Sequence, residues 1–356
     1  MAKVAVIKTR PESVLQDYRK VMELAEYKKF LPSSYETILK LNLSWSLYYP
    51  ACSTQPWQLD GILKTLTEDG YRGLHAMENK TVVTDVWKGA HGNKWLPVLR
   101  KYGLQYEPLT NVKWIPYKPK AELLALHEIF PEGQMIPECF IGKNVLHPPT
   151  IKTHGHTTMT GAMKNAFGGL ITEKRHHCHK KIHEVLVDLL AIQQEIHPGI
   201  FAVMDGTVAG DGAGPRTMIP RVKNYLLASG DQVAIDAISA KMMGFDPMKI
   251  KFIKMAHDRG LGCGDVDQIE IVGEDVSKVN FHFSTNKSPV IFWDQVFRKG
   301  SLSFVEPLLF HTGLFKGAIF GSAFYHDYLW YNLIGRSRIR KFKKTPWGKL
   351  WKKYRR

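Results

Sequence analysis

Apolar residues follow two different spacings along the first 275 positions of this chain. Five short, largely apolar runs predict buried strands, at residues 4–7, 37–43, 73–77, 200–204 and 268–272. Between them, apolar residues recur three and four positions apart, which predicts helices at residues 13–30, 57–66, 95–102, 181–196, 233–243 and 248–259. Strands and helices that alternate in this way predict an α/β fold, with a mainly parallel sheet and helices on both faces.

The pattern changes twice outside this core. Residues 111–142 are rich in Pro, Trp and Tyr and form a candidate insertion in an α/β domain of residues 1–275. Residues 276–335 are hydrophobic and aromatic, and residues 336–356 form a basic tail. We therefore expect a C-terminal aromatic and basic helical extension, in which no apolar run reaches the roughly 18 to 20 residues that span a bilayer.

The most informative segment is residues 151–165, where a predicted strand ends and a helix is expected to begin near Thr158. Ligands in α/β proteins bind where strands give way to helices. A helix from Thr158 would set Thr160 and Lys164 one turn apart. Lys152, His154 and Lys164 are candidate catalytic residues, because neighbouring cations favour a neutral amine and His titrates near neutrality. Alternatively, the segment is a solvated turn with two structural histidines.

A glycine-rich stretch follows the strand at residues 200–204. It contains Asp205, Asp211, Gly212 and Gly214, and we expect a loop whose backbone N–H groups bind an anion. The stretch matches neither the phosphate-binding nor the dinucleotide-binding glycine pattern. An ordinary long turn is the alternative.

Several other polar residues have simpler explanations. Ser229 and Gln232 predict a capping box, and Asp231 at the same helix start is a capping carboxylate. Asp236 lies inside that helix and could face the site. The histidine-rich residues 176–183 have Lys and Arg neighbours, which favours a solvated, partly protonated loop over a metal site.

Taken together, these motifs resemble the domain-of-unknown-function family 362 from about residue 3 to residue 275. The resemblance rests on four stretches: Lys40 with Asn42, residues 151–165, residues 205–215 and residues 228–247. It implies an α/β domain and places Lys40 and Asn42 beside the other motifs, but it supplies no reaction. Many members carry an iron–sulfur ferredoxin module with clustered cysteines. A weaker analogy links the spacing of His154 and Lys164 to nickel-pincer lactate racemases.

The four cysteines are scattered singly, so no ferredoxin-type motif is present and the cofactor stays unknown, with a divalent metal as one option. The chain has a formal charge of +16, and eleven of its Lys and Arg residues fall within 336–356, which leaves +5 for the rest. Cations interleaved with aromatic residues predict that the tail binds an anionic membrane surface. A nearly neutral body makes nucleic acid an unlikely partner. We expect a cytoplasmic protein that is peripheral on the inner membrane face.

Three functions stay open. The first is an enzyme that acts on an anionic or carboxylated small molecule, with His154 as acid and base and Lys152 and Lys164 polarising the ligand. The second is a non-catalytic ligand- or metal-binding scaffold docked on membranes, and the third is an oxidoreductase component with a separate ferredoxin-like partner. The substrate-binding candidates are Lys40, Asn42, Thr160, Asn165, Gly212 and Gly214. The residues expected to orient the cations or hold a metal are Asp205, Asp211 and Asp236.

Overall fold

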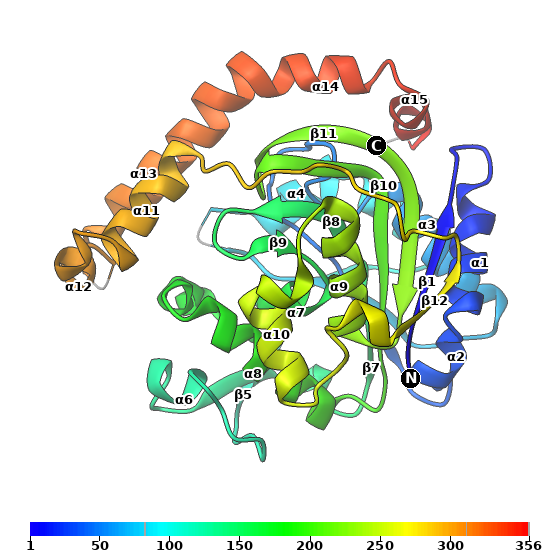
Figure 1. The fold of residues 1–356 in the computed structure, drawn as a ribbon, viewed down its shortest axis with the longest axis horizontal. Coiled ribbons are helices and arrows are strands. Elements are labelled where there is room, and N and C mark those ends of the chain that lie inside the picture. Colours follow the sequence, from blue (N-terminus) through cyan, green and yellow to red (C-terminus); the bar gives the residue numbers. More distant parts are fainter. Residues whose placement is uncertain (82, 311, 355–356) are drawn as a thin grey trace.

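The computed structural model describes residues 1–81, 83–310 and 312–354 and has one large mixed sheet at its centre (Figure 1). The strand order is β12-β1-β11-β10-β7-β2-β3-β4, and β8 and β9 extend the sheet beside β10. The strands are β1 (Ala2–Lys8), β2 (Thr37–Lys40), β3 (Leu74–Glu78), β4 (Tyr106–Pro108), β7 (Asn144–His147), β8 (Thr150–His154), β9 (Thr158–Thr160), β10 (Ile200–Ala213), β11 (Thr217–Ser229) and β12 (Ile269–Gly273).

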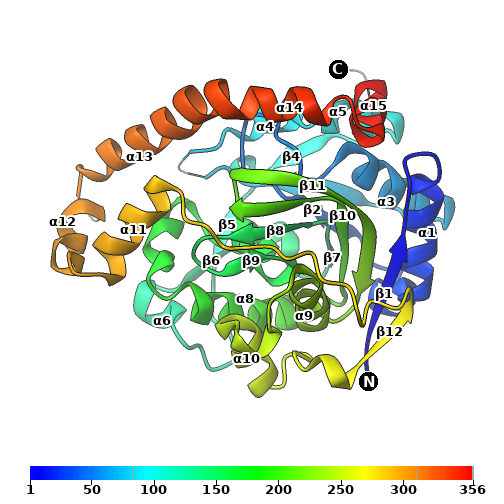
Figure 2. The ribbon, with the colours of Figure 1, turned by 45° about the horizontal axis from the view of Figure 1, so that its top comes forward.

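Most neighbouring strands run parallel, as the sequence pattern predicts. Strands β4, β3, β2, β7 and β10 pair in parallel, and so do β1 with β12 and β8 with β10. Strand β11 runs antiparallel to both β1 and β10, and β9 runs antiparallel to β8. Because the parallel strands share a direction, their carboxyl ends meet at one edge of the sheet (Figure 2).

Helices cover both faces of this sheet, so the strand side chains alternate between two cores. Ile38 and Met204 contribute to one core and Leu39 and Val203 to the other. The first core is covered by α7 (Ala162–Leu170), α8 (Ile182–Ile196), α9 (Gln232–Met243) and α10 (Lys251–Asp258). The second is covered by α1 (Val14–Leu24), α2 (Tyr27–Phe30), α3 (Pro56–Glu68), α4 (Val86–Gly92) and α5 (Trp95–Lys101). The predicted fold class is confirmed.

Two helix starts differ from the prediction. The helix expected at 13–30 is broken between α1 and α2, where Glu26 adopts a left-handed φ of 53°. The helix expected from Thr158 begins at Ala162, because Thr158–Thr160 pairs with β8 as β9. Thr160 and Lys164 therefore do not lie on one helical face. At α9 the predicted capping box is absent, because Asp231 is the N-cap and Ser229 Oγ accepts from its backbone N–H.

The glycine-rich stretch at 205–215 is a strand, which corrects the predicted anion-binding loop. Strand β10 continues to Ala213 and forms a long hairpin with β11. A Cβ atom at Gly206 would lie 2.6 Å from Ile151, and one at Gly214 would lie 1.7 Å from the carbonyl oxygen of Thr153. These glycines therefore let β8 approach β10, and their role is close packing rather than anion binding.

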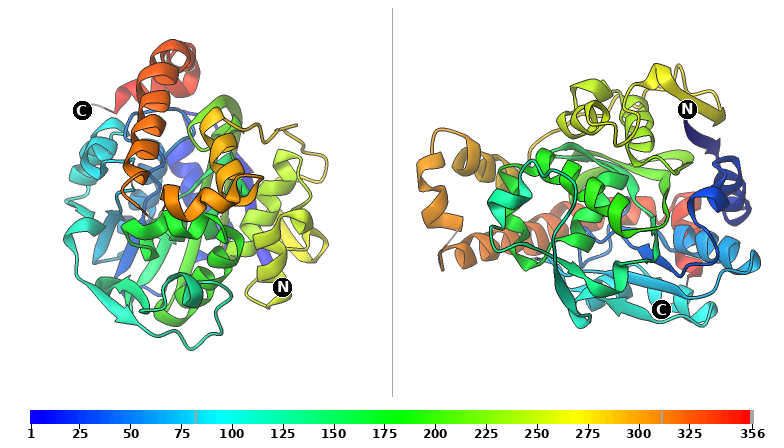
Figure 3. Two further views of the ribbon diagram at one scale, coloured as in Figure 1. Left: turned by 90° about the vertical axis from the view of Figure 1, so that its left-hand side faces the viewer. Right: turned by 90° about the horizontal axis from the view of Figure 1, so that it is seen from below.

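The remaining segments lie around this core. Within residues 111–142, β5 (Trp114–Tyr117) and β6 (Gln134–Pro137) form a separate two-stranded sheet, and α6 (Leu126–Ile129) lies between them in sequence. The C-terminal part forms a helical arm that leaves the body and then returns across the β10–β11 hairpin (Figures 1 and 3). Its elements are α11 (Pro289–Lys299), α12 (Glu306–Phe310), α13 (Phe315–Ala323), the π-helix η7 (Phe324–Gly335), α14 (Arg336–Phe342) and α15 (Pro346–Lys353).

The basic tail is folded onto the body of the protein. Trp347 packs against Trp57 with ring centroids 5.2 Å apart, and Trp351 stacks on Tyr48 at 4.4 Å. Phe342, Trp347 and Trp351 are all buried in the second core. The aromatic residues that were expected at a membrane surface are thus used for internal packing.

Candidate functional site

A cavity of about 640 Å³ lies at the carboxyl ends of β2, β3 and β8. Helix α7 and the 3-10 helix η3 (Glu173–His179) form one side, and α11, α12, α13 and η7 of the C-terminal arm cover it. Among the predicted site residues, those that line it are Lys40, Asn42, His154, Thr160, Lys164, Asn165 and Gly214. Residues from three of the four motifs therefore share one space, and none from residues 228–247 lines it.

The floor of the cavity contains a buried ion pair between Lys40 and Glu78. The two side chains are 1% and 4% exposed, and Lys40 Nζ lies 2.7 Å from Glu78 Oε1. Burial lowers the pKa of Lys40, and the Glu78 carboxylate opposes that effect. Glu78 also accepts hydrogen bonds from the backbone N–H groups of Leu43 and Asn79. Gly168 makes room for the pair, because a Cβ atom there would lie 3.1 Å from both partners.

Lys152 lies behind this floor and does not line the cavity. Its Nζ donates to Asn42 Oδ1, to the carbonyl oxygen of Cys52 at 3.0 Å and to Thr150 Oγ1 at 2.9 Å. Every one of these acceptors is neutral, and burial lowers the pKa of Lys152 to about 7. Lys152 thus titrates near neutral pH without touching the cavity itself.

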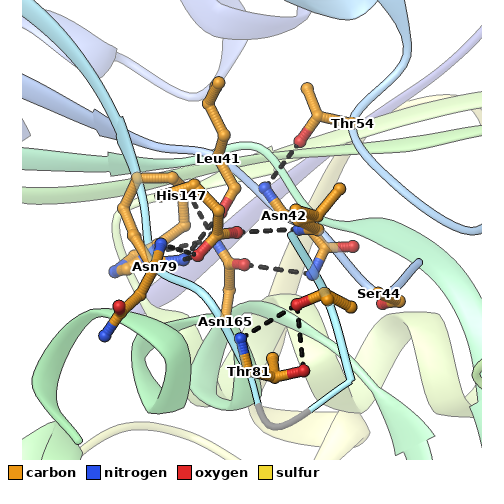
Figure 4. A network of polar contacts seen from close by, with 12 residues as sticks. Leu41, Asn42, Ser44, Thr54, Asn79, Thr81, His147 and Asn165 are labelled. Atoms are coloured by element: carbon orange, nitrogen blue, oxygen red, sulfur yellow. Dashed lines mark hydrogen bonds and ion pairs between the residues drawn. The ribbon is translucent and has the colours of Figure 1, made fainter. Parts of the chain in front are cut away.

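A chain of hydrogen bonds joins Lys152 to α7 through Asn42, and Figure 4 shows its part from Asn42 through Asn165 to His147. Asn42 Nδ2 donates to Asn165 Oδ1 at 3.2 Å, and Asn165 Nδ2 donates to His147 Nδ1 at 3.1 Å. His147 Nε2 lies 2.7 Å from Gln193 Oε1, so the proton of this imidazole is on Nε2. Burial lowers the pKa of His147 to about 3 and keeps it neutral. The chain therefore fixes the orientation of both asparagine amides in the cavity wall.

Lys164 projects from the first turn of α7 into the cavity. Its Nζ lies 5.2 Å from the centre of the Phe167 ring, and within the described residues no acceptor is at hydrogen-bond distance. Burial, together with the nearby Arg175 charge, lowers its pKa to about 8. Thr160 Oγ1 and Arg216 Nη1, on two other residues that line the cavity, are also buried without a partner there. Two buried donor atoms of the cavity wall and the half-buried ammonium of Lys164 thus lack acceptors among the described residues.

His154, at the end of β8, is held as a neutral imidazole. Its Nδ1 accepts the backbone N–H of His156 at 3.2 Å, which leaves the proton on Nε2. Burial lowers its pKa well below the ordinary value, and the Lys164 charge adds to this effect. The near-neutral pKa expected from the sequence is therefore wrong, and His154 is a hydrogen-bond donor at neutral pH.

The three aspartates are not gathered at the cavity. Asp205 accepts from Tyr18, Trp57 and Thr207, and Asp211 accepts from Arg221 and from the backbone N–H of Ser284. Asp236 accepts from the backbone N–H groups of Ala162 and Met163 and so caps α7. Within the described part of the chain, each carboxylate therefore accepts hydrogen bonds from residues around it and not from groups in the cavity. Gly212 also lies outside the lining, with φ of +96° and its carbonyl oxygen bonded to Thr153.

Several lining residues were not identified from the sequence. Glu78 ends β3 beside Lys40, and its position after a predicted strand was an available signal. The histidine-rich segment is η3, and its His176 and His179 line the cavity, so the predicted solvated loop is wrong. Burial lowers the pKa of His179 well below the ordinary value. The sequence around Arg216 and the covering helices does not indicate that they line the cavity, because only the tertiary fold brings them here.

The described residues contain no cluster of three or more His, Cys, Asp or Glu side chains arranged to hold a metal ion. In the same ranges, no helix combines the length and the apolar character needed to cross a membrane.

Comparisons with known proteins agree with the motif pattern. A family model described as "Domain of unknown function (DUF362)" matches residues 37–241, which include every strand and helix that lines the floor. The chain is 24% identical to Thylakoid-associated protein sll1697 of Synechocystis sp. over 258 residues, covering 70% of this chain and 76% of that protein. No solved structure matches the chain.

Proposed function

This chain belongs to the domain-of-unknown-function family 362, and we propose that it binds an anionic, amphipathic small molecule in its cavity and exchanges a proton with it. The observation that carries the proposal is a set of three donors in the lining: the buried atoms Thr160 Oγ1 and Arg216 Nη1 and the half-buried ammonium of Lys164, which have no acceptor among the described residues. A buried donor without a partner costs roughly 1–3 kcal/mol, so a ligand that supplies acceptors is favoured.

The charge of the cavity supports an anion. Its described lining residues include five cationic side chains and two carboxylates, Glu78 and Asp294. Glu78 pairs with Lys40, and Asp294 pairs with Arg298 at 3.0 Å. Cationic side chains therefore outnumber carboxylates in the lining, and we assign the anionic group of the ligand to Lys164 and Arg216.

The opposite wall supports an apolar part in the same ligand. The C-terminal arm contributes Ile291, Phe297, Phe310, Phe315 and Ile319 to the lining. Such a wall buries hydrocarbon at about 25 cal/mol per Å² of apolar surface. A carboxylate or phosphate with an alkyl or aromatic portion fits both walls, whereas a small inorganic anion leaves the apolar wall uncovered.

The proposed chemistry assigns different roles to Lys164 and His154. With a pKa of about 8, Lys164 is a source of both ammonium and neutral amine near neutral pH, which suits a group that donates and accepts protons. His154 offers the N–H of Nε2 and would hold an anionic oxygen. If the protein is a scaffold without a catalytic step, the same two groups serve as ligand-binding donors.

Calorimetric titration with four ten-carbon probes tests the ligand class. We expect decanoate and decyl phosphate to bind, and decanol and decyltrimethylammonium to bind at least tenfold more weakly. Lys164→Met should weaken decanoate binding about tenfold, since a charged hydrogen bond is worth roughly 1.5–3 kcal/mol. Lys249→Met, at a lysine whose side chain is 85% exposed, is the control and should bind normally. Equal affinity for decanol and decanoate contradicts the proposal.

The proposal also includes work at a membrane surface, as a peripheral protein. The printed name of the cyanobacterial relative, a thylakoid-associated protein, supports this part. The cationic tail supports it as well, because a basic residue near an anionic bilayer contributes about 1 kcal/mol. Co-sedimentation of the full chain with vesicles of phosphatidylglycerol and with vesicles of phosphatidylcholine tests it, and binding to neither contradicts it.

A further inference from the structure

The outward side of the C-terminal arm carries an apolar strip on α13 and η7. Phe320, Phe324, Tyr328 and Leu333 are 72%, 47%, 67% and 75% exposed, and we call these four residues the outer strip. The three aromatic rings stack along the helix, with centroids 6.3 Å apart for Phe320 and Phe324 and 6.1 Å apart for Phe324 and Tyr328. Soluble surfaces rarely expose a continuous apolar row of this kind, and such rows mark interaction sites.

The inner side of the same helices fixes the strip in its outward position. Ile319, Tyr325 and His326 line the cavity from this helix. Trp330 packs on Trp45 with centroids 6.0 Å apart. Because the inner side of these helices contacts the cavity and the core, a rotation that turned the outer strip inward would break these contacts and open the cavity wall.

The charges around the strip are positive. Lys316 precedes it in α13, and the exposed Arg336, Arg340, Lys341 and Lys344 follow it. The sequence after Glu306 contains one acidic residue, Asp327, and its carboxylate accepts the indole N–H of Trp45 at 2.7 Å. An apolar strip with cations at both ends complements an anionic bilayer, where apolar side chains enter the acyl region and cations meet the headgroups.

We infer that the outer strip docks this protein on an anionic lipid bilayer, with α13 and η7 lying in the plane of the interface. The inference rests on the part of the proposed function that places the protein at a membrane surface, and it names the element responsible. The tail aromatics, on which the sequence-based expectation relied, are buried at Phe342, Trp347 and Trp351. The strip thus supplies the apolar contact, and the tail supplies charge only.

The docked geometry has a consequence for the cavity. One helix run carries the strip on its outer side and a cavity wall on its inner side, so the bilayer would lie against the wall of the ligand site. An amphipathic anion that leaves the bilayer at this place meets the apolar lining of α11 and α13 before the cations of the floor. The inferred ligand source is therefore the membrane itself.

Vesicle flotation of the full chain tests the inference with three matched variants. The strip variant is Phe320→Gln, Phe324→Gln and Tyr328→Gln. The control variant replaces three exposed apolar residues of the body, Tyr35→Gln, Ile141→Gln and Val222→Gln, which are 44% to 45% exposed. The charge variant is Arg340→Gln, Lys341→Gln and Lys344→Gln. Circular dichroism melting checks that each variant is folded, and decanoate titration checks that its cavity is intact.

With phosphatidylglycerol vesicles we expect the strip variant to bind at least tenfold more weakly than the native chain, and the control variant to bind normally. The charge variant should bind more weakly at low salt and approach the native chain at high salt. If the native chain and the strip variant float equally, the outer strip is not the docking element, while the proposed membrane association stands. If the native chain does not float, both the docking role of the strip and the proposed membrane association are contradicted. The inference is also overturned if the native chain does not float and is a dimer in vesicle-free buffer, while the strip variant is a monomer. The outer strip would then be the contact with a second copy of the chain.

Discussion

Replacing Lys164 with Arg separates the charge of this side chain from its ability to titrate. In the folded protein the pKa of Lys164 is lowered to about 8, by burial and by the Arg175 charge. An anion bound against Nζ removes that penalty and returns the pKa toward the ordinary value of about 10.4. Ligand binding is therefore expected to take up protons above pH 8.

The magnitude follows from these two pKa values. At pH 9 about nine tenths of Lys164 is neutral in the free protein and almost none in the complex, so binding takes up about 0.9 proton. At pH 7 the uptake falls to about 0.1 proton. The same linkage lowers the affinity about tenfold between pH 7 and pH 9. Decanoate itself stays ionised across this range, so it contributes no proton.

Calorimetry of decanoate binding in two buffers of different ionisation enthalpy measures the uptake directly. The native chain should show about 0.9 proton at pH 9. Lys164→Arg should keep an affinity within a few-fold of the native value at pH 7, show no uptake and lose the tenfold fall at pH 9, because Arg stays charged. Uptake from Lys152 would persist in this variant. Equal uptake by the native chain and Lys164→Arg at pH 9 refutes the assignment of the proton to Lys164.

Three further predictions concern stability. Lys152 has a pKa of about 7 in the folded chain and about 10.4 in the unfolded chain, so the unfolded chain binds more protons between these two pH values and stability rises with pH. From pH 7 to pH 9.5, urea unfolding should show the free energy of unfolding rising by about 3 kcal/mol more in the native chain than in Lys152→Met. Parallel pH profiles of the two chains contradict this prediction. Glu78→Gln leaves Lys40 buried without its partner and should cost roughly 3–5 kcal/mol, which the double variant with Lys40→Met should largely recover. Trp347→Ala should lower the free energy of unfolding by roughly 3–5 kcal/mol, and a loss below 1 kcal/mol means that the tail is not packed on Trp57.

The fold was largely predictable because the parallel strands are buried on both faces. A strand such as β2 is apolar along its length, and helices such as α8 show clear three- and four-residue spacing, so both signals are local. The errors fall where a distant element decides the local structure. Residues 158–160 become a strand because β8 lies beside them, and 205–213 extend β10 because glycine admits β8 at close range.

The lining of the cavity was predictable in part, for the same reason. Lys40, His154 and Lys164 follow strand ends or begin a helix, and the carboxyl edge of a parallel sheet brings such positions together. Arg216 lies in the turn between β10 and β11, and Phe315 lies on the arm; both reach the cavity through the tertiary arrangement alone. The spacing of residues in the sequence therefore does not predict that Arg216 and Phe315 lie beside the cavity.

Asp205 and Asp211 were assigned to the site because they lie in the glycine-rich stretch, and Asp236 because it lies inside a helix where it could face the site. The energetics of burial explain their different roles. A buried carboxylate is stable only with several donors, and each aspartate has found them far along the chain, as Asp205 has in Tyr18 and Trp57. The cavity donor atoms Thr160 Oγ1, Lys164 Nζ and Arg216 Nη1 lack such partners among the described residues. A cavity wall that leaves these donors open is biased toward an anionic ligand, because an acceptor-bearing molecule can complete them. The same bias explains why the amine of Lys164 titrates near 8 when the cavity holds no anion.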